Sequence, residues 1–177
     1  MAKGSSFERD ICKQLSLWWT DYKRDDVFWR TAGSGARATV RSKKKKGTFG
    51  QHGDVQATDP IGQPLMDIFS IELKRGYTQA TASNAFDASK QTKKHIFLEF
   101  VEQAEQSRAG SSSRFWMLIH KRDRRETLVT IPYTAAKILR LRKLPHILMS
   151  TDGYGILQIK FSAFLKKVTP DKIRSLI

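Results

Sequence analysis

Apolar positions along the chain recur at two spacings, which predict an alternation of helices and strands. Residues 5–19 carry a large apolar side chain every three or four positions: Phe7, Ile11, Leu15 and Trp18 or Trp19. This spacing is typical of an amphipathic helix with one buried face. Ser5 and Glu8 stand three residues apart, as in a capping box at a helix N-terminus. The chain is therefore expected to begin with a helix.

Short runs rich in β-branched and aromatic residues predict strands further along the chain. The predicted strands cover residues 27–31, 54–58, 65–75, 115–120, 128–131 and 155–161. Helices are predicted at an apolar stripe that begins at Ile96, at residues 133–143, and after the cap Thr169-Pro170. Turn-forming or charged residues predict connections at 59–64, 107–113 and 121–126. This order predicts a single α/β domain over residues 1–177.

A glycine- and serine-rich loop at 32–36 leads into the segment with the highest positive charge. The basic loop at 36–53 contains Arg37, Arg41 and the run Lys43, Lys44, Lys45 and Lys46. Blocks of like charge repel one another and stay extended unless they meet an opposite charge. Two interpretations remain open: a loop that becomes ordered on DNA, and a loop that is only solvated.

The overall charge narrows the class of partner. The chain has 32 Lys and Arg against 17 Asp and Glu, a net charge of +15. Hydrophobic residues make up 40% of it, which excludes a disordered basic tail. A folded domain with this charge is expected to bind nucleic acid, because basic groups release counterions from phosphates. The alternatives are a charge that only confers solubility, a ribosomal protein, or a protein on an anionic membrane.

Two further features concern the compartment. No apolar run approaches the roughly 20 residues that span a bilayer, and residues 1–5 lack the apolar stretch of a signal peptide. The single cysteine, Cys12, excludes an intramolecular disulfide framework and suits a reducing interior. We therefore expect a soluble, cytoplasmic protein with no membrane partner. Because Cys12 lies beside the apolar stripe of the first helix, a structural thiol is favoured over a nucleophile.

The candidate chemistry lies at Asp54 and in the strand that contains Glu72 and Lys74. Because side chains alternate along a strand, Glu72 and Lys74 should share one face. Together with Asp54 they would form a compact polar cluster. Two carboxylates and a backbone carbonyl suit Mg²⁺, which acidifies a bound water for attack on phosphorus. Lys74 would then orient or deprotonate that water, or stabilise developing negative charge. The alternative is an ordinary surface ion pair.

Taken in order, these residues resemble the PD-(D/E)xK nuclease superfamily. Within it they are most similar to archaeal-type Holliday junction resolvases, whose fold also occurs in phage enzymes. The resemblance covers about residues 3–120 and rests on four blocks: Lys-Gly-Ser-Ser-Phe-Glu-Arg-Asp at 3–10, Trp-Arg-Thr-Ala-Gly-Ser-Gly at 29–35, Gly53-Asp54, and Ile-Glu-Leu-Lys at 71–74.

The resemblance implies a restriction-endonuclease-like core, a central mixed sheet flanked by helices. It also implies a homodimer that resolves four-way DNA junctions by paired nicks, using Mg²⁺ with Mn²⁺ as a substitute. The implied metal-site acids are Glu8, Asp54 and Glu72, and the implied catalytic lysine is Lys74. Arg30 and Ser34 are added to the catalytic set. The DNA-binding set is Arg9, Arg30, Ser34, Arg37, Arg41, Lys43, Lys44, Lys45, Lys46 and Arg75.

Three departures from the family pattern leave alternatives open. The segment between Gly35 and Asp54 is long and rich in lysine, the spacing from Asp54 to Glu72 exceeds the minimal pattern, and a C-terminal extension from about residue 133 has no counterpart. The enzyme could instead be a restriction-like or nicking endonuclease on linear or other branched DNA. A non-catalytic DNA-binding module is the third possibility. Glu8 could serve only the capping box, and Arg30 and Ser34 could be ordinary loop-flanking residues.

Overall fold

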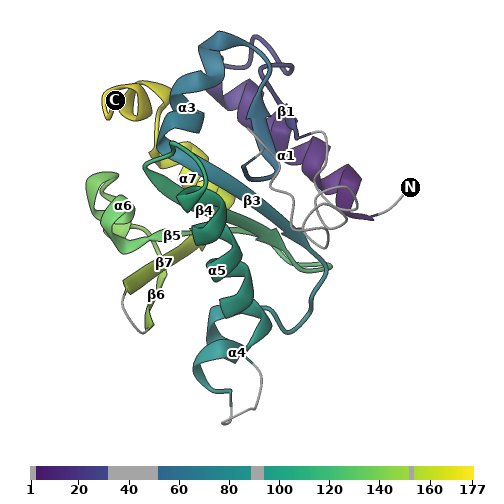
Figure 1. Ribbon diagram of the computed structural model, residues 1–177, viewed down its shortest axis with the longest axis vertical. Coiled ribbons are helices and arrows are strands. Elements are labelled where there is room, and N and C mark those ends of the chain that lie inside the picture. The colour runs from purple at the N-terminus through teal and green to yellow at the C-terminus, as the bar shows by residue number, and fades with distance from the viewer. Residues whose placement is uncertain (1–2, 32–51, 89–93, 152–153) are drawn as a thin grey trace.

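The computed structural model describes residues 3–31, 52–88, 94–151 and 154–177, and a five-stranded mixed sheet forms its centre (Figure 1). The strand order is β3-β4-β5-β7-β6. Its first two strands are parallel and the remaining neighbours are antiparallel. The strands are β3 (Phe69–Arg75), β4 (Phe115–Lys121), β5 (Thr127–Pro132), β6 (Ile147–Thr151) and β7 (Tyr154–Lys160). The predicted α/β class with a central mixed sheet is confirmed.

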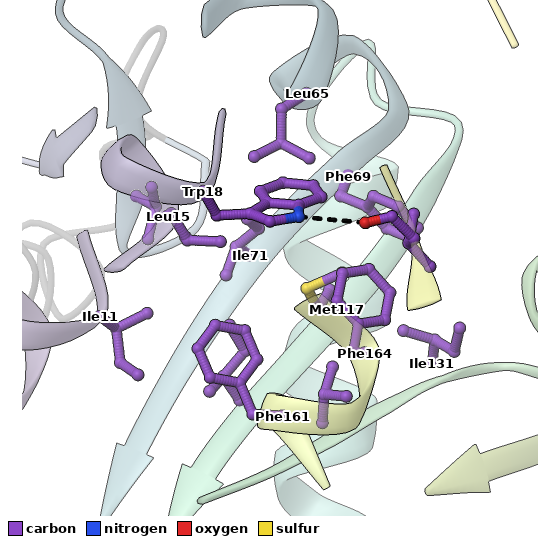
Figure 2. Close-up of a cluster of buried hydrophobic side chains, with 14 of the residues drawn as sticks. Ile11, Leu15, Trp18, Leu65, Phe69, Ile71, Met117, Ile131, Phe161 and Phe164 are labelled. Carbon is purple, nitrogen blue, oxygen red and sulfur yellow. Dashed lines mark hydrogen bonds between the residues drawn. The ribbon is translucent and has the colours of Figure 1, made fainter. Parts of the chain in front are cut away.

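Helices cover both faces of this sheet. The larger core packs α1 (Lys3–Trp19), α7 (Phe161–Lys167) and α8 (Pro170–Arg174) against one face. Figure 2 shows this core, in which Trp18 Nε1 donates a hydrogen bond of 3.0 Å to the Val168 carbonyl. A second core lies under α4 (Ala82–Phe86) and α5 (Ile96–Ala109) on the other face. The parallel step from β3 to β4 therefore crosses over through these helices, as parallel strands require.

A small antiparallel ribbon lies next to the main sheet. It consists of β1 (Phe28–Arg30) and β2 (Val55–Ala57), and α1 packs against β1. The strand β3 lies closest to this ribbon and is buried on both faces. Phe69, Ile71 and Leu73 enter the larger core, whereas Glu72 is buried on the face covered by α5. The alternation predicted for the strand is thus present, with its polar positions under a helix.

The predicted strand 65–75 is wrong at its start. Residues 65–68 belong to α3 (Gln63–Ile68), and the strand begins at Phe69. The predicted turn before it is also helical, with η1 (Pro60–Gly62) capped by the Asp59 side chain. Pro60 and Pro64 each stand in the first turn of a helix, where proline's fixed φ and missing N–H are tolerated. The short, mostly apolar segment 65–68, Leu-Met-Asp-Ile, fits a helix as well as a strand.

The chain after residue 106 also differs in detail from the predictions. The helix α5 continues to Ala109, so the predicted link at 107–113 begins inside it. The predicted helix 133–143 is two pieces, α6 (Tyr133–Ile138) and η2 (Leu141–Lys143), separated by Arg140 at φ 57°. The strand β6 and the helix α7 were not predicted, whereas the cap at Thr169 is confirmed. Because β7 pairs between β5 and β6, the C-terminal third belongs to the main sheet. Among the described residues, no helix is long and apolar enough to cross a membrane.

One buried group in the sheet stands out as titratable. His120 on β4 is 2% exposed, and neither ring nitrogen has a hydrogen-bond partner in the part of the chain that the structure describes. Its ring packs against Phe97 of α5 with the centroids 5.9 Å apart. Burial, with a smaller contribution from the charge of Arg122, lowers the pKa of His120 to about 4. The imidazole is therefore neutral in the folded protein near pH 7.

This burial predicts a pH-dependent stability. Between pH 6.5 and about 4 the unfolded chain binds a proton at His120 that the folded chain does not. The contribution of His120 to the free energy of unfolding should therefore fall by roughly 3 kcal/mol as the pH drops through this window. Urea unfolding at several pH values measures this contribution as the difference between the wild type and His120→Leu, since all other titrating groups are common to both. The exposed His146 provides the control, because His146→Gln should keep the wild-type profile. An identical loss in His120→Leu would assign the effect to other groups.

Candidate active site

Asp54 is held at the edge of β3 by two hydrogen bonds. Its backbone N–H donates to the Ile71 carbonyl at 2.7 Å, and its Oδ2 accepts from the Leu73 N–H at 2.8 Å. The Asp54 carboxylate thus lies beside the stretch of backbone that carries Glu72. The sequence predicted Asp54 on a strand neighbouring that of Glu72. Instead, Asp54 immediately precedes β2, which pairs with β1, and it reaches β3 through these two bonds.

The close approach of Asp54 to β3 depends on Gly53. This residue has φ +74°, and a Cβ atom built on it would lie 2.7 Å from the Ile71 carbonyl oxygen. Thr31 supports the same turn from the other side: its N–H donates to the Asp54 carbonyl and its hydroxyl donates to the Gly53 carbonyl, each at 3.0 Å. Glycine is therefore required at position 53 by both its conformation and the available space.

Glu72 is a buried carboxylate with two polar partners. It is 4% exposed. Its Oε1 accepts a hydrogen bond of 2.6 Å from Ser107 Oγ, and its Oε2 lies 3.4 Å from Lys74 Nζ. Burial, followed by the charge of Asp54, raises the pKa of Glu72 to about 7, against the opposing effects of Lys74 and Ser107. Two carboxylates are thus forced together where water is scarce, an arrangement that a cation would stabilise.

Lys74 lies on the same face of β3 as Glu72, as the alternation predicted. Its side chain is 17% exposed, so most of the side chain is covered and a part of it stays open to solvent. The Nζ atom also lies 5.7 Å from the centroid of the Phe100 ring on α5. The ammonium is therefore held between a carboxylate and an aromatic face.

Glu8 and Arg30 form a second polar group next to this pair. Arg30 Nη1 donates to Glu8 Oε2 at 3.4 Å, which joins β1 to the N-terminal half of α1. Burial raises the pKa of Cys12 to about 12, and the charges of Glu8 and Asp54 add to this effect. Both acids are therefore within electrostatic range of one thiol on α1. That thiol stays protonated, which agrees with a structural role for Cys12.

The structure gives two oxygen donors for a metal in close association rather than three. Among the described residues, no group of three or more His, Cys, Asp or Glu side chains gathers closely enough to hold an ion. The Asp54–Glu72 pair nevertheless fits a divalent cation, because both groups are hard oxygen donors and one is dehydrated. Participation of Glu8 in a metal site stays a prediction, since the structure pairs it with Arg30.

The remaining predicted site residues fall into two classes. Arg9 lies partly exposed on α1, and Arg75 lies on the opposite face of β3 from Lys74, 6.0 Å from the Phe7 ring centroid. The second class lies outside the described residues: Ser34, Arg37, Arg41, Lys43, Lys44, Lys45 and Lys46.

Sequence reasoning missed Thr31, Phe100 and Ser107 as parts of the site. For Ser107 a signal existed, because it follows Ala104 at the three-residue spacing of the apolar stripe in that helix.

Comparison with protein families agrees with this geometry. A family model described as "Phage putative PDDEXK endonuclease" matches residues 1–175. The chain belongs to this family. The match includes the C-terminal third, and it makes this PDDEXK protein a nuclease with a restriction-endonuclease-like fold. Nucleases of this type generally use divalent metal ions. The comparisons with curated proteins and with solved structures found no match.

Replacement of Gly53 tests the clamp on Asp54. In Gly53→Ala, the new methyl group would collide with the Ile71 carbonyl and displace Asp54 from β3. Since a misplacement of about 1 Å in an active site costs on the order of a hundredfold in rate, DNA cleavage by this nuclease should fall by about that factor.

Gly155→Ala on β7 is the control for Gly53→Ala. It introduces a 3.2 Å contact with Tyr133 Cβ away from the site and should keep wild-type cleavage. Full activity in Gly53→Ala would show that the position of Asp54 is unimportant.

Removal of the Ser107 hydroxyl tests how the Glu72 charge is maintained. The hydrogen bond from Ser107 favours the ionised carboxylate, so Ser107→Ala should move the Glu72 titration midpoint upward by about one pH unit. The measurement is the carboxyl carbon chemical shift of Glu72 in metal-free protein, followed by nuclear magnetic resonance. Ser111→Ala, which removes a hydroxyl that donates to Arg108 instead, should leave the midpoint unchanged. A midpoint that does not move in Ser107→Ala would contradict the assigned hydrogen bond.

Proposed function

We propose that this nuclease is a metal-dependent endodeoxyribonuclease that cleaves branched DNA, with four-way junctions as its main substrate. Asp54, Glu72 and Lys74 are the catalytic residues. The observation that carries the proposal is the carboxylate pair of Asp54 and the buried Glu72 with the Lys74 ammonium in contact, at the edge of β3. The PDDEXK motif in the family name is an acid followed by Asp or Glu, any residue and Lys, and Asp54, Glu72 and Lys74 are the same residue types in the same order.

Asp54 and Glu72 would hold Mg²⁺, or Mn²⁺ in its place, with a backbone carbonyl as a further donor. When bound, the metal supplies an acidified water for attack on phosphorus and offsets transition-state charge. The protein's part is to keep the two carboxylates in position. Ser107 fixes one oxygen of Glu72, and the Leu73 N–H fixes one oxygen of Asp54. Asp54 would therefore offer its Oδ1 to the cation, whereas Glu72 would share its Oε2 between the cation and Lys74.

Lys74 would orient the attacking water or donate to a phosphate oxygen. Its ammonium is anchored by Glu72, and its side chain is partly open to solvent. Arg30 would assist from β1, because its contact with Glu8 uses one Nη atom and leaves the rest of the guanidinium for a phosphate. Arg9 and Arg75 flank this region on α1 and β3. The basic segment that contains Lys43 to Lys46 would add affinity through counterion release.

Branched DNA is favoured by the order of the four sequence blocks, which is that of junction resolvases, and by the net charge of +15. Paired nicks in a four-way junction need two active sites facing opposite strands, so we propose a homodimer that acts in the cytoplasm. The alternative within the same chemistry is a restriction-like or nicking enzyme on linear duplex. A module that only binds DNA is disfavoured, because acids near phosphate weaken binding unless they serve catalysis.

Cleavage of defined DNA substrates tests both the site and the substrate. Equimolar labelled linear, forked and four-way DNA would be incubated with Mg²⁺ and the wild type, Asp54→Asn or Glu72→Gln. Each variant should cut at least about a hundredfold more slowly while still binding DNA. Glu102→Gln is the matched control, since Glu102 is an exposed carboxylate on α5 that pairs with Lys94. Wild-type rates in Asp54→Asn and Glu72→Gln would refute the assigned site. Preference for linear duplex would refute the junction substrate and leave the site standing.

A further inference from the structure

We infer that Tyr77 is a stacking platform for one unpaired nucleotide beside the cleavage site, and that the basic hairpin between β4 and β5 holds the flanking phosphates. This inference rests on the proposed function and deepens it. It makes the preferred substrate a DNA in which a base lies outside the continuous stack, as at a fork or branch point.

The position of Tyr77 relative to Lys74 is the first argument. Tyr77 follows β3 and is 53% exposed. Its ring meets Phe100 of α5 edge to face, with the centroids 4.9 Å apart. The same Phe100 ring lies 5.7 Å from Lys74 Nζ. One phenyl group thus fixes the exposed tyrosine next to the catalytic amine, while about half of the tyrosine surface stays open to a partner.

The backbone at this position is the second argument. Gly76 and Tyr77 have φ values of 98° and 41°, so the chain passes through two consecutive left-handed residues. Bulky side chains rarely occupy this region, and such strain concentrates at functional sites. The turn is tied on both sides, because Gly76 N–H donates to the Lys121 carbonyl and Ala80 N–H donates to the Tyr77 carbonyl. The fold thus holds a strained, exposed aromatic residue in place.

The charge around Tyr77 is the third argument. The hairpin at 121–126 joins β4 to β5 and contains Lys121, Arg122, Arg124 and Arg125 against Asp123 and Glu126. It lies alongside the turn, since Arg122 Nη1 donates to the Thr78 carbonyl at 3.5 Å. Figure 1 shows the chain leaving β3 at the edge of the sheet where β4 turns into β5. Arg124 and Arg125 are exposed there and can meet phosphates.

An aromatic residue among basic groups distinguishes DNA structures. In a continuous duplex the two faces of each base are covered by its neighbours, so an exposed tyrosine finds no base to stack on. A base at a fork or branch point can leave the stack and pack against the ring. Such stacking is tolerant of sequence, because every base has a π-face, and the arginines add a salt-dependent attraction for the backbone.

The test compares binding of two DNAs by protein that cannot cut them. Fluorescence anisotropy would measure binding of the Asp54→Asn protein to a forked duplex and to a continuous duplex of equal length. Adding Tyr77→Ala should weaken fork binding about tenfold and duplex binding less than about twofold. Tyr77→Phe should bind both DNAs as the parent does, because stacking needs the ring and not the hydroxyl. A 2-aminopurine at the first unpaired position should be quenched by the parent and by Tyr77→Phe only.

Two further variants make the comparison decisive. Tyr22 is 79% exposed with φ 61°, but it lies beyond the opposite end of α1 from Glu8, so Tyr22→Ala should leave fork binding unchanged. Tyr77→Gly removes the ring and relieves the left-handed strain, so it should fold and show the same loss as Tyr77→Ala.

Unchanged fork binding in Tyr77→Gly, or an equal loss on both DNAs, would overturn the platform even if the enzyme cleaves branched DNA. A selective loss on the fork would support the platform even if the cleavage experiment rejected the assigned catalytic residues.

Discussion

The hydrogen bond from the Leu73 N–H to the Asp54 carboxylate is the contact on which the rest of the site depends. It holds Asp54, which precedes Glu72 by 18 positions in the sequence, against the strand that carries Glu72 and Lys74. An edge strand normally offers its backbone groups to another strand. Here a side chain takes one of those groups, so the strand edge becomes a reactive surface instead of a pairing surface. Gly53 leaves the space that lets Asp54 come this close to β3, and Thr31 holds the turn by a hydrogen bond to the Gly53 carbonyl.

The central features of the site could be predicted because they follow from strand geometry and from an ordered set of motifs. Alternation alone places Glu72 and Lys74 on one face, and the motif order brings Asp54 beside them. What alternation could not show is the burial of that face, because it depends on α5, in the crossover from β3 to β4, packing over the strand. The burial matters chemically, since it raises the pKa of Glu72, whereas an exposed Glu-x-Lys pair would titrate normally.

The errors in the fold have equally physical origins. Leu65, Met66 and Ile68 are apolar side chains suited to either state, and Pro64, with its fixed φ, favours a helix. Ser107 looked like part of a polar link because composition outweighed the helical spacing that continues from Ala104. The strand β6 is an edge strand with exposed Ile147 and Leu148, so it lacks the alternating burial from which strands are recognised.

The hydrogen bond between Trp18 and Val168 joins the first helix to the last part of the chain (Figure 2). The helix that carries Glu8 is therefore anchored by a residue 150 positions further along the chain, and the central sheet needs β7 to join β5 and β6. A chain interrupted before these segments would contain every acidic residue of the site and yet lack the scaffold that aligns them.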